Sequence, residues 1–71
     1  MKFVVNGKEI ESNTEPTISE LLVEQNVKMP EMVSVELNGQ ILKRSEIEST
    51  TIKADDKVEF LYFMGGGDGF E

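Results

Sequence analysis

The 71-residue sequence contains no cysteine and no histidine. The absence of cysteine excludes disulfide bonds and thiolate nucleophiles, and the absence of both residue types excludes the usual zinc sites. Histidine is also the commonest general base in enzymes. We therefore expect no metal site and no stand-alone enzyme, because so small a chain offers no nucleophile and base pair.

Long apolar runs are also missing. No stretch approaches the ~20 apolar residues that a membrane-spanning helix requires. The N-terminal stretch MKFVVNGKEIES lacks the apolar segment and the small-residue cleavage site of a signal peptide. We therefore expect a cytoplasmic protein without a membrane partner.

Basic residues are scarce, since seven Lys and Arg oppose fourteen Asp and Glu and give a formal net charge of -7. This charge opposes phosphate binding and argues against nucleic acid or an anionic membrane as a partner. It favours a basic partner protein, although solubility alone accounts for it equally well. Because the chain is short, we expect one domain, which buries only about 60% of the surface that its unfolded form exposes. A large internal active-site cavity is therefore not expected.

The first half of the chain shows hairpin and helix signals. Asn6-Gly7 separates short apolar-containing runs at 2–5 and 8–12, which predicts two strands joined by a tight turn. In the stretch EPTISELLVEQN, Thr17 and Glu20 have the spacing of a helix capping box. The helix that follows has one apolar face, formed by Ile18, Leu21 and Leu22, and an opposite face with Glu20 and Glu24.

The second half alternates apolar and polar residues with period two. Val33, Val35 and Leu37 alternate with polar residues, which predicts a half-buried strand, and Asn38-Gly39 then turns the chain toward Ile41 and Leu42. The stretch Asp55-Asp56-Lys57 predicts a turn before the strand-like run VEFLYFM.

These elements predict an α+β fold with a mixed sheet of about four or five strands and one main helix packed on one face. A helix that follows a hairpin crosses over the sheet, so we expect the third and last long strands to flank the first pair. We expect residues 1–64 to form the domain and residues 65–71 to form a flexible glycine-rich tail.

The last strand has apolar residues on both faces of its C-terminal half. Val58, Phe60 and Tyr62 alternate with Leu61 and Phe63, although only one helix is expected to cover the sheet. In the simpler interpretation, the second apolar face is covered by loops, or the strand lies at the centre of the sheet. The functional interpretation is a patch around Leu61 and Phe63 that docks a partner.

The ordered set VVNGKEIE, TISELL, VSVELNG, SEIE and DDKVEFLYFMGGG resembles the ThiS family of sulfur carriers over residues 1 to 67. Each motif alone is common, whereas the whole set, ending on a strand and glycines, is specific. The resemblance implies the ubiquitin-like β-grasp fold. It also implies that the chemistry takes place at a C-terminal carboxylate.

In that family an adenylyltransferase related to ubiquitin-activating enzymes uses ATP and magnesium to adenylate the terminal glycine. Sulfur from a persulfide protein then displaces AMP and leaves a thiocarboxylate, which a thiazole synthase uses for the thiazole half of thiamine. The resemblance thus implies a protein cosubstrate that binds no cofactor itself.

The glycine run suits such chemistry on physical grounds. Without Cβ atoms, Gly65, Gly66 and Gly67 can adopt both extended and positive-φ conformations, and we expect them to fit through a channel too narrow for larger side chains. We predict Gly67 as the site of adenylation and of the thiocarboxylate, with Gly66 as the alternative. A plain flexible linker is the simpler interpretation of the same glycines.

Residues 68–71 depart from the family pattern, because they follow the glycines. We expect a protease to remove them; the alternatives are an inert tail or a relative that has lost the sulfur role. Sulfur delivery for homocysteine, cysteine or methionine synthesis remains an alternative pathway. Two further alternatives are a non-catalytic ubiquitin-like interaction module and a module that is conjugated to lysine.

Three other charged pairs are weaker candidates. Asp55 with Asp56, and Asp68 with Glu71, lack the ligand spacing of a calcium loop and are interpreted as solvated turns. The pair at 43–44, Lys43-Arg44, contacts an activated phosphate or an acidic partner in one interpretation and is solvated surface in the other.

Overall fold

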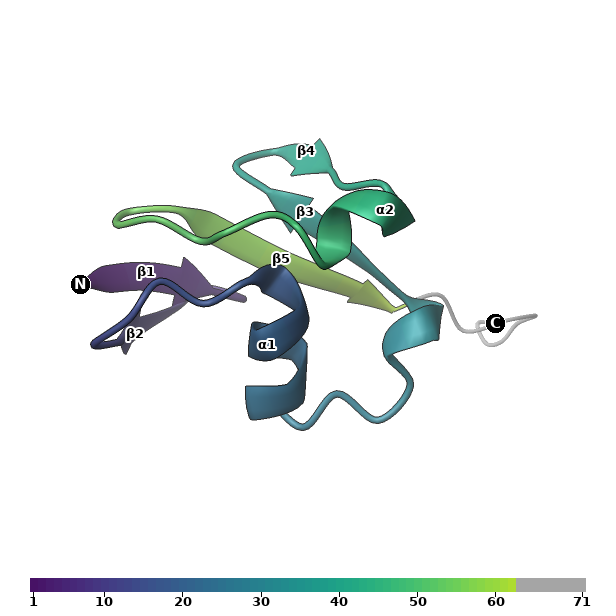
Figure 1. Ribbon diagram of the computed structural model, residues 1–71, viewed down its shortest axis with the longest axis horizontal. Coiled ribbons are helices and arrows are strands. Elements are labelled where there is room, and N and C mark those ends of the chain that lie inside the picture. The colour runs from purple at the N-terminus through teal and green to yellow at the C-terminus, as the bar shows by residue number, and fades with distance from the viewer. Residues whose placement is uncertain (63–71) are drawn as a thin grey trace.

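Residues 1–62 are described by a computed structural model, in which a single sheet carries short helices on one side (Figure 1). The elements in chain order are β1 (Lys2–Val5), β2 (Lys8–Glu11), α1 (Ile18–Glu24), the 3₁₀ helix η1 (Pro30–Met32), β3 (Val33–Leu37), β4 (Gln40–Ile41), α2 (Arg44–Ile47) and β5 (Lys57–Tyr62).

The sheet has five strands in the order β2-β1-β5-β3-β4. The pairs β1–β2, β3–β5 and β3–β4 are antiparallel, and β1–β5 is parallel. The predicted mixed sheet is thus confirmed. The expectation that the third and last long strands flank the first pair is right for β5 only, since β5 lies between β1 and β3. After the first hairpin the chain crosses over the sheet and leaves one edge of β1 unpaired. Strand β5 then pairs with that edge.

Both predicted Asn-Gly turns are present. Asn6 and Asn38 have φ values of 51° and 52°, and Gly7 and Gly39 have φ values of 80° and 88°. Positive φ at both central residues matches the right-handed twist of the flanking strands, and asparagine followed by glycine adopts it at little cost. Each turn therefore results directly from its two residues.

The helix α1 begins with the predicted capping box. The Thr17 hydroxyl accepts a hydrogen bond from the Glu20 amide at 3.1 Å, and the Glu20 carboxylate accepts one from the Thr17 amide at 2.9 Å. Two backbone donors that the helix cannot satisfy internally are thereby satisfied. The predicted apolar face is buried against the sheet, with Ile18, Leu21 and Leu22 at 4% exposure or less.

A second short helix, α2, was not predicted. Its N-terminal turn is held by the Glu46 carboxylate, which accepts from the Lys43 amide at 2.7 Å. It adds Ile47 to the same core as α1, so both helices cover one face of the sheet (Figure 1). The core consists of buried residues from strands, helices and the loop before β5: Phe3, Val5, Ile18, Leu21, Leu22, Val33, Val35, Ile47, Ile52, Val58 and Phe60.

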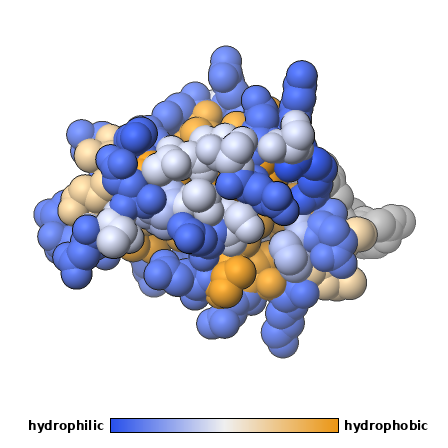
Figure 2. Space-filling model, viewed as in Figure 1, coloured by the Kyte–Doolittle hydropathy of each residue, from blue (hydrophilic) through white to orange (hydrophobic). Residues whose placement is uncertain are grey.

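The helix-bearing side of the molecule is mostly hydrophilic, and its apolar residues form small separate areas (Figure 2). The opposite side of the sheet, which we call the open face, carries the alternate residues of each strand. None of the helices within residues 1–62 has the length and apolar character needed to cross a membrane.

Candidate functional site

Strand β5 leads toward the glycine run and lies at the centre of the sheet. Five consecutive Cα pairs join it to β3, from Val33 with Tyr62 to Leu37 with Val58. On its other side, β1 pairs with its first residues in parallel. Because neighbours hold β5 on both sides, the sheet fixes the position and direction of the strand that precedes the glycines.

The asparagines of both turns also bind β5. The side-chain oxygen of Asn6 accepts a hydrogen bond from the Phe60 amide at 2.9 Å. The side-chain oxygen of Asn38 accepts one from the Lys57 amide at 2.9 Å. Sequence reasoning assigned these asparagines to turns alone, because nothing local indicates that their side chains reach a strand far along the chain. Their second role is to satisfy β5 amides that no neighbouring strand satisfies.

Arg44 holds the 3₁₀ helix η1 and the first residue of β3, which lies beside the C-terminal end of β5. Its guanidinium donates to the carbonyl oxygens of Pro30, Glu31 and Val33, at 3.0, 2.8 and 2.6 Å. Val33 is the Cα partner of Tyr62, the last described residue of β5. Neither interpretation offered for Arg44 from the sequence anticipated this, since the guanidinium binds backbone of its own chain. Arg44 thus stabilises the backbone that borders the end of β5.

The open face of β5 is charged at first and apolar near its end. Lys57 and Glu59 are exposed there, whereas Leu61 is half-buried. On the helix side Val58 and Phe60 are buried, but Tyr62 remains 56% exposed because it lies at the end of the strand. Within the described part of β5, the apolar surface expected on the open face therefore consists of Leu61 alone. Phe63 lies outside the described residues, and the docking role of Leu61 and Phe63 stays a prediction.

The acidic turn before β5 has a structural use. The two carboxylate oxygens of Asp56 accept hydrogen bonds from the Asn38 side-chain amide at 3.0 Å and from the Lys53 amide at 2.8 Å. Asp55 occupies the turn with φ of 70°. Within residues 1–62 no group of three potential metal-ligating side chains occurs. Asp68 and Glu71 lie outside the described residues.

The predicted chemical site also falls on residues that the structure does not describe. Gly65, Gly66 and Gly67 belong to this part of the chain. The roles assigned to them, threading for all three and thiocarboxylate formation at Gly67 or Gly66, remain predictions. What the described chain contributes is a central strand, held from both sides, that ends five residues before Gly67 in the sequence.

The model of the ThiS family matches residues 2–67. The chain belongs to the ThiS family. The predicted family is thereby confirmed, and the match includes the three glycines but excludes residues 68–71.

Solved ThiS structures confirm the ubiquitin-like β-grasp fold. A crystal structure of the thiamine biosynthesis protein ThiS from Geobacter metallireducens is 46% identical, with a TM-score of 0.83 over 94% of this chain and 100% of that chain. A solution structure of a thiamine biosynthesis protein from the same organism is also 46% identical, with a TM-score of 0.77 over 96% of this chain and 90% of that chain.

Two curated relatives of this ThiS-family chain are much longer proteins. A thiazole synthase from Paramagnetospirillum magneticum is 36% identical over 67 residues, and one from Magnetococcus marinus is 31% identical over 67 residues. Each match covers 94% of this chain and 20% of the relative. The chain therefore spans about a fifth of the length of these relatives.

Proposed function

We propose that this domain is a sulfur carrier of thiamine biosynthesis, which carries sulfur as a thiocarboxylate on a glycine at the end of its β-grasp domain. The observation that carries the proposal is the extent of the family match, which runs from residue 2 to Gly67 and stops at the last of three consecutive glycines. The 46% identity to thiamine biosynthesis proteins of the same fold supports the pathway.

The chemistry begins with a carboxylate that is too weak an electrophile to react with sulfur. An adenylyltransferase partner transfers the AMP portion of magnesium-bound ATP to the Gly67 carboxylate, and pyrophosphate leaves. The terminal sulfur of a protein persulfide attacks the acyl carbon and expels AMP, which gives an acyl disulfide. A thiol then reduces this disulfide and frees the thiocarboxylate, so the domain acts as a cosubstrate and the partners act as the enzymes.

A free carboxylate on Gly67 requires hydrolysis of the peptide bond between Gly67 and Asp68. We assign this step to a processing protease, and cleavage after Gly66 is the alternative. The boundary of the family match at residue 67 supports Gly67 as the end of the functional carrier. Residues 68–71 have no role in the sulfur chemistry under this proposal.

The thiazole synthase relatives favour thiazole formation as the destination of the sulfur. Each contains a segment similar to this chain within a much longer protein. A single polypeptide that both carries and uses sulfur is consistent with a carrier whose C-terminal glycines are bound by a thiazole synthase. We therefore place a thiazole synthase among its partners, together with the adenylyltransferase and the persulfide protein.

The geometry of the sheet limits how such partners approach. Tyr62 is five residues before Gly67, so even a fully extended link spans at most about 18 Å. A reaction centre must therefore come within that distance of the end of β5. Partners are expected to bind the domain on surfaces close to this end.

The test is the intact mass of the protein isolated from its own cells, before and after treatment with an alkylating reagent that traps thiocarboxylates. We expect a species that ends at Gly67 or Gly66, in which one carboxylate oxygen is replaced by sulfur and which the reagent alkylates. Only species that retain residues 68–71, in cells starved of thiamine, would contradict the proposal.

A further inference from the structure

The two Asn-Gly turns share the features that make an asparagine chemically labile. In both turns the asparagine and the glycine are exposed and have positive φ. A Cβ atom added at Gly7 or at Gly39 would meet no atom within 4 Å, so the space around each glycine is open. Neither glycine amide donates a hydrogen bond within residues 1–62. Each amide nitrogen is therefore free to attack the side-chain carbonyl carbon of the asparagine before it.

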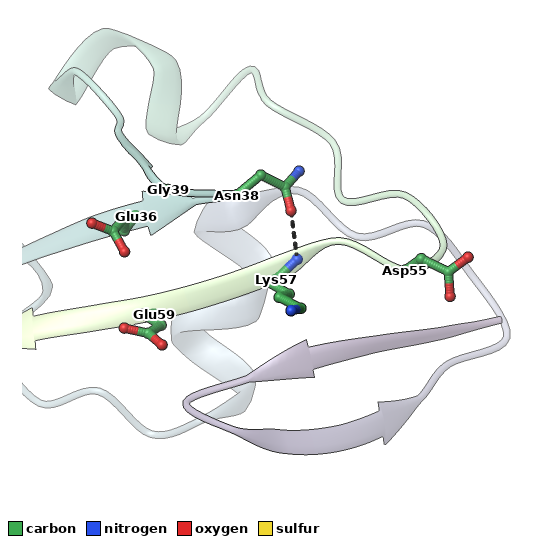
Figure 3. A pocket seen from close by; sticks show the side chains of 6 residues that line it. All are labelled: Glu36, Asn38, Gly39, Asp55, Lys57 and Glu59. Carbon is green, nitrogen blue, oxygen red and sulfur yellow. Dashed lines mark hydrogen bonds between the residues drawn. The ribbon is translucent and has the colours of Figure 1, made fainter.

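The two asparagines differ in how their side-chain amide groups are held. Asn6 Oδ1 accepts a hydrogen bond from the Phe60 amide at 2.9 Å, and Asn6 Nδ2 donates to no group within residues 1–62. Asn38 Oδ1 likewise accepts from the Lys57 amide at 2.9 Å (Figure 3). Asn38 Nδ2, however, also donates to the Asp56 carboxylate at 3.0 Å. In the described chain, the side-chain nitrogen is thus held at Asn38 and not at Asn6.

These contacts involve the two atoms whose charge changes during the attack. Negative charge develops on Oδ1, and an amide donor already at that oxygen stabilises it. Both asparagines have such a donor. The leaving group is Nδ2, which must take up a proton and depart as ammonia. At Asn38 this nitrogen must first lose its hydrogen bond to a carboxylate, which belongs to a strong class of hydrogen bond.

We propose that Asn6-Gly7 is a site of spontaneous deamidation in the folded domain, and that the contact with Asp56 protects Asn38-Gly39. The Gly7 nitrogen forms a bond to Asn6 Cγ and gives up its proton, the bond from Cγ to Nδ2 breaks, and ammonia leaves. The product is a cyclic succinimide. Water then adds to one of the two ring carbonyl carbons and opens the ring to aspartate or to isoaspartate. No oxidant or reductant takes part, and the proposal does not depend on the sulfur chemistry.

The two products differ in their effect on β5. Aspartate at position 6 keeps a side-chain oxygen for the Phe60 amide. In isoaspartate the main chain runs through Cβ and Cγ, so the oxygen that accepted from Phe60 is displaced and the turn is lengthened by one carbon. The Asn6 amide also donates to the Val58 carbonyl at 2.8 Å, so this residue holds β5 at two points. Isoaspartate therefore weakens the attachment of β5 to the first hairpin.

The experiment follows deamidation of the full 71-residue chain, both folded in buffer and unfolded in guanidinium chloride. Digested samples are separated by chromatography, and peptides with asparagine, aspartate or isoaspartate at each turn are identified by mass. In the unfolded chain we expect similar rates, because an aliphatic residue precedes each Asn-Gly pair. In the folded chain we expect Asn6 to convert on the order of tenfold faster than Asn38, the factor that one charge-assisted hydrogen bond provides.

Two variants test the protection of Asn38. Asp56→Ala removes the acceptor of Asn38 Nδ2 and is expected to raise the deamidation rate at Asn38 roughly tenfold, while the rate at Asn6 stays within about twofold. Asp55→Asn is the control, because it removes one neighbouring negative charge, retains a residue type that tolerates positive φ and leaves the contact between Asn38 and Asp56 in place. It is expected to leave both rates within about twofold. The rate at Asn6 also reports unfolding of the variant chain.

Several results would overturn the proposal. They are equal rates at the two sites of the folded chain, faster conversion at Asn38, or a ratio that the unfolded chain reproduces. Intact Asn6 in the folded chain, at a time when the unfolded chain has converted fully, would overturn it as well. A final comparison tests the effect on β5: the purified isoaspartate form is expected to exchange its Phe60 amide about tenfold faster than Asn6→Asp. Equal exchange in the two forms would refute that effect.

Discussion

Substitution of Asn6 tests whether the side chain that binds β5 stabilises the domain. Asn6→Ala removes the acceptor for the Phe60 amide, a partly buried bond of 2.9 Å, and places alanine at a φ of 51°. The lost bond and the unsatisfied amide cost about 1–3 kcal/mol, and positive φ at alanine adds about 1 kcal/mol. We therefore expect the free energy of unfolding to fall by about 2–4 kcal/mol. In a domain of this size that lowers the melting temperature by roughly 10–25 °C.

Two companion substitutions separate these contributions. Asn6→Gly tolerates the positive φ but lacks the acceptor, so we expect a loss of about 1–3 kcal/mol. Asn6→Asp retains an acceptor and tolerates the turn, so we expect a change within about 0.5 kcal/mol. Urea unfolding followed by circular dichroism gives all three values, provided that the slope stays constant. The reasoning is refuted if Asn6→Asp loses as much stability as Asn6→Ala, or if Asn6→Gly unfolds at the wild-type midpoint.

Two further changes test the contacts that stabilise α1 and the segment formed by η1 and the start of β3. Thr17→Ala removes the acceptor for the Glu20 amide and should lower the free energy of unfolding by about 1 kcal/mol in urea, while Thr17→Ser should stay close to the wild type. Arg44→Ala removes the guanidinium donor from three carbonyl oxygens, of which Pro30 O still accepts from the Val33 amide, and should cost about 1–3 kcal/mol, with faster amide hydrogen exchange in residues 31–33. Arg44→Lys should recover less than half of that loss, because an ammonium does not match the planar fork of the guanidinium. Full recovery would show that the positive charge alone holds η1 and the start of β3.

Elements with strong local signals were predictable from the sequence. The Asn-Gly turns and the capping box depend on residues no more than three positions apart, and their side chains or φ preferences act on neighbouring backbone. The alternation of apolar and polar residues from Val33 to Leu37 likewise indicates which side chains of that strand are buried. These parts of the fold needed no knowledge of distant residues.

Helix α2 and the strand order were not predictable in the same way. The position before Arg44 is occupied by Lys43, which is not a residue type that caps helices, and a helix of four residues shows hardly one turn of periodicity. The place of β5 between β1 and β3 depends on contacts across most of the chain. The same holds for Arg44, whose three acceptors lie 11 to 14 positions away. The pairing of Glu36 with Glu59 likewise depends on the strand register, which the sequence does not give.

The central position of β5 has a consequence for how the domain assembles. Without β5, residues 1–62 are left with two separate hairpins, β1–β2 and β3–β4, and an isolated two-stranded hairpin is marginally stable at best in water. Val4 of the first hairpin meets Lys57 only after most of the chain has been made. Folding is therefore expected to be all or none, with no stable intermediate that lacks β5. Under the proposed function, a chain that presents its glycines to an enzyme is then one whose entire sheet has already formed.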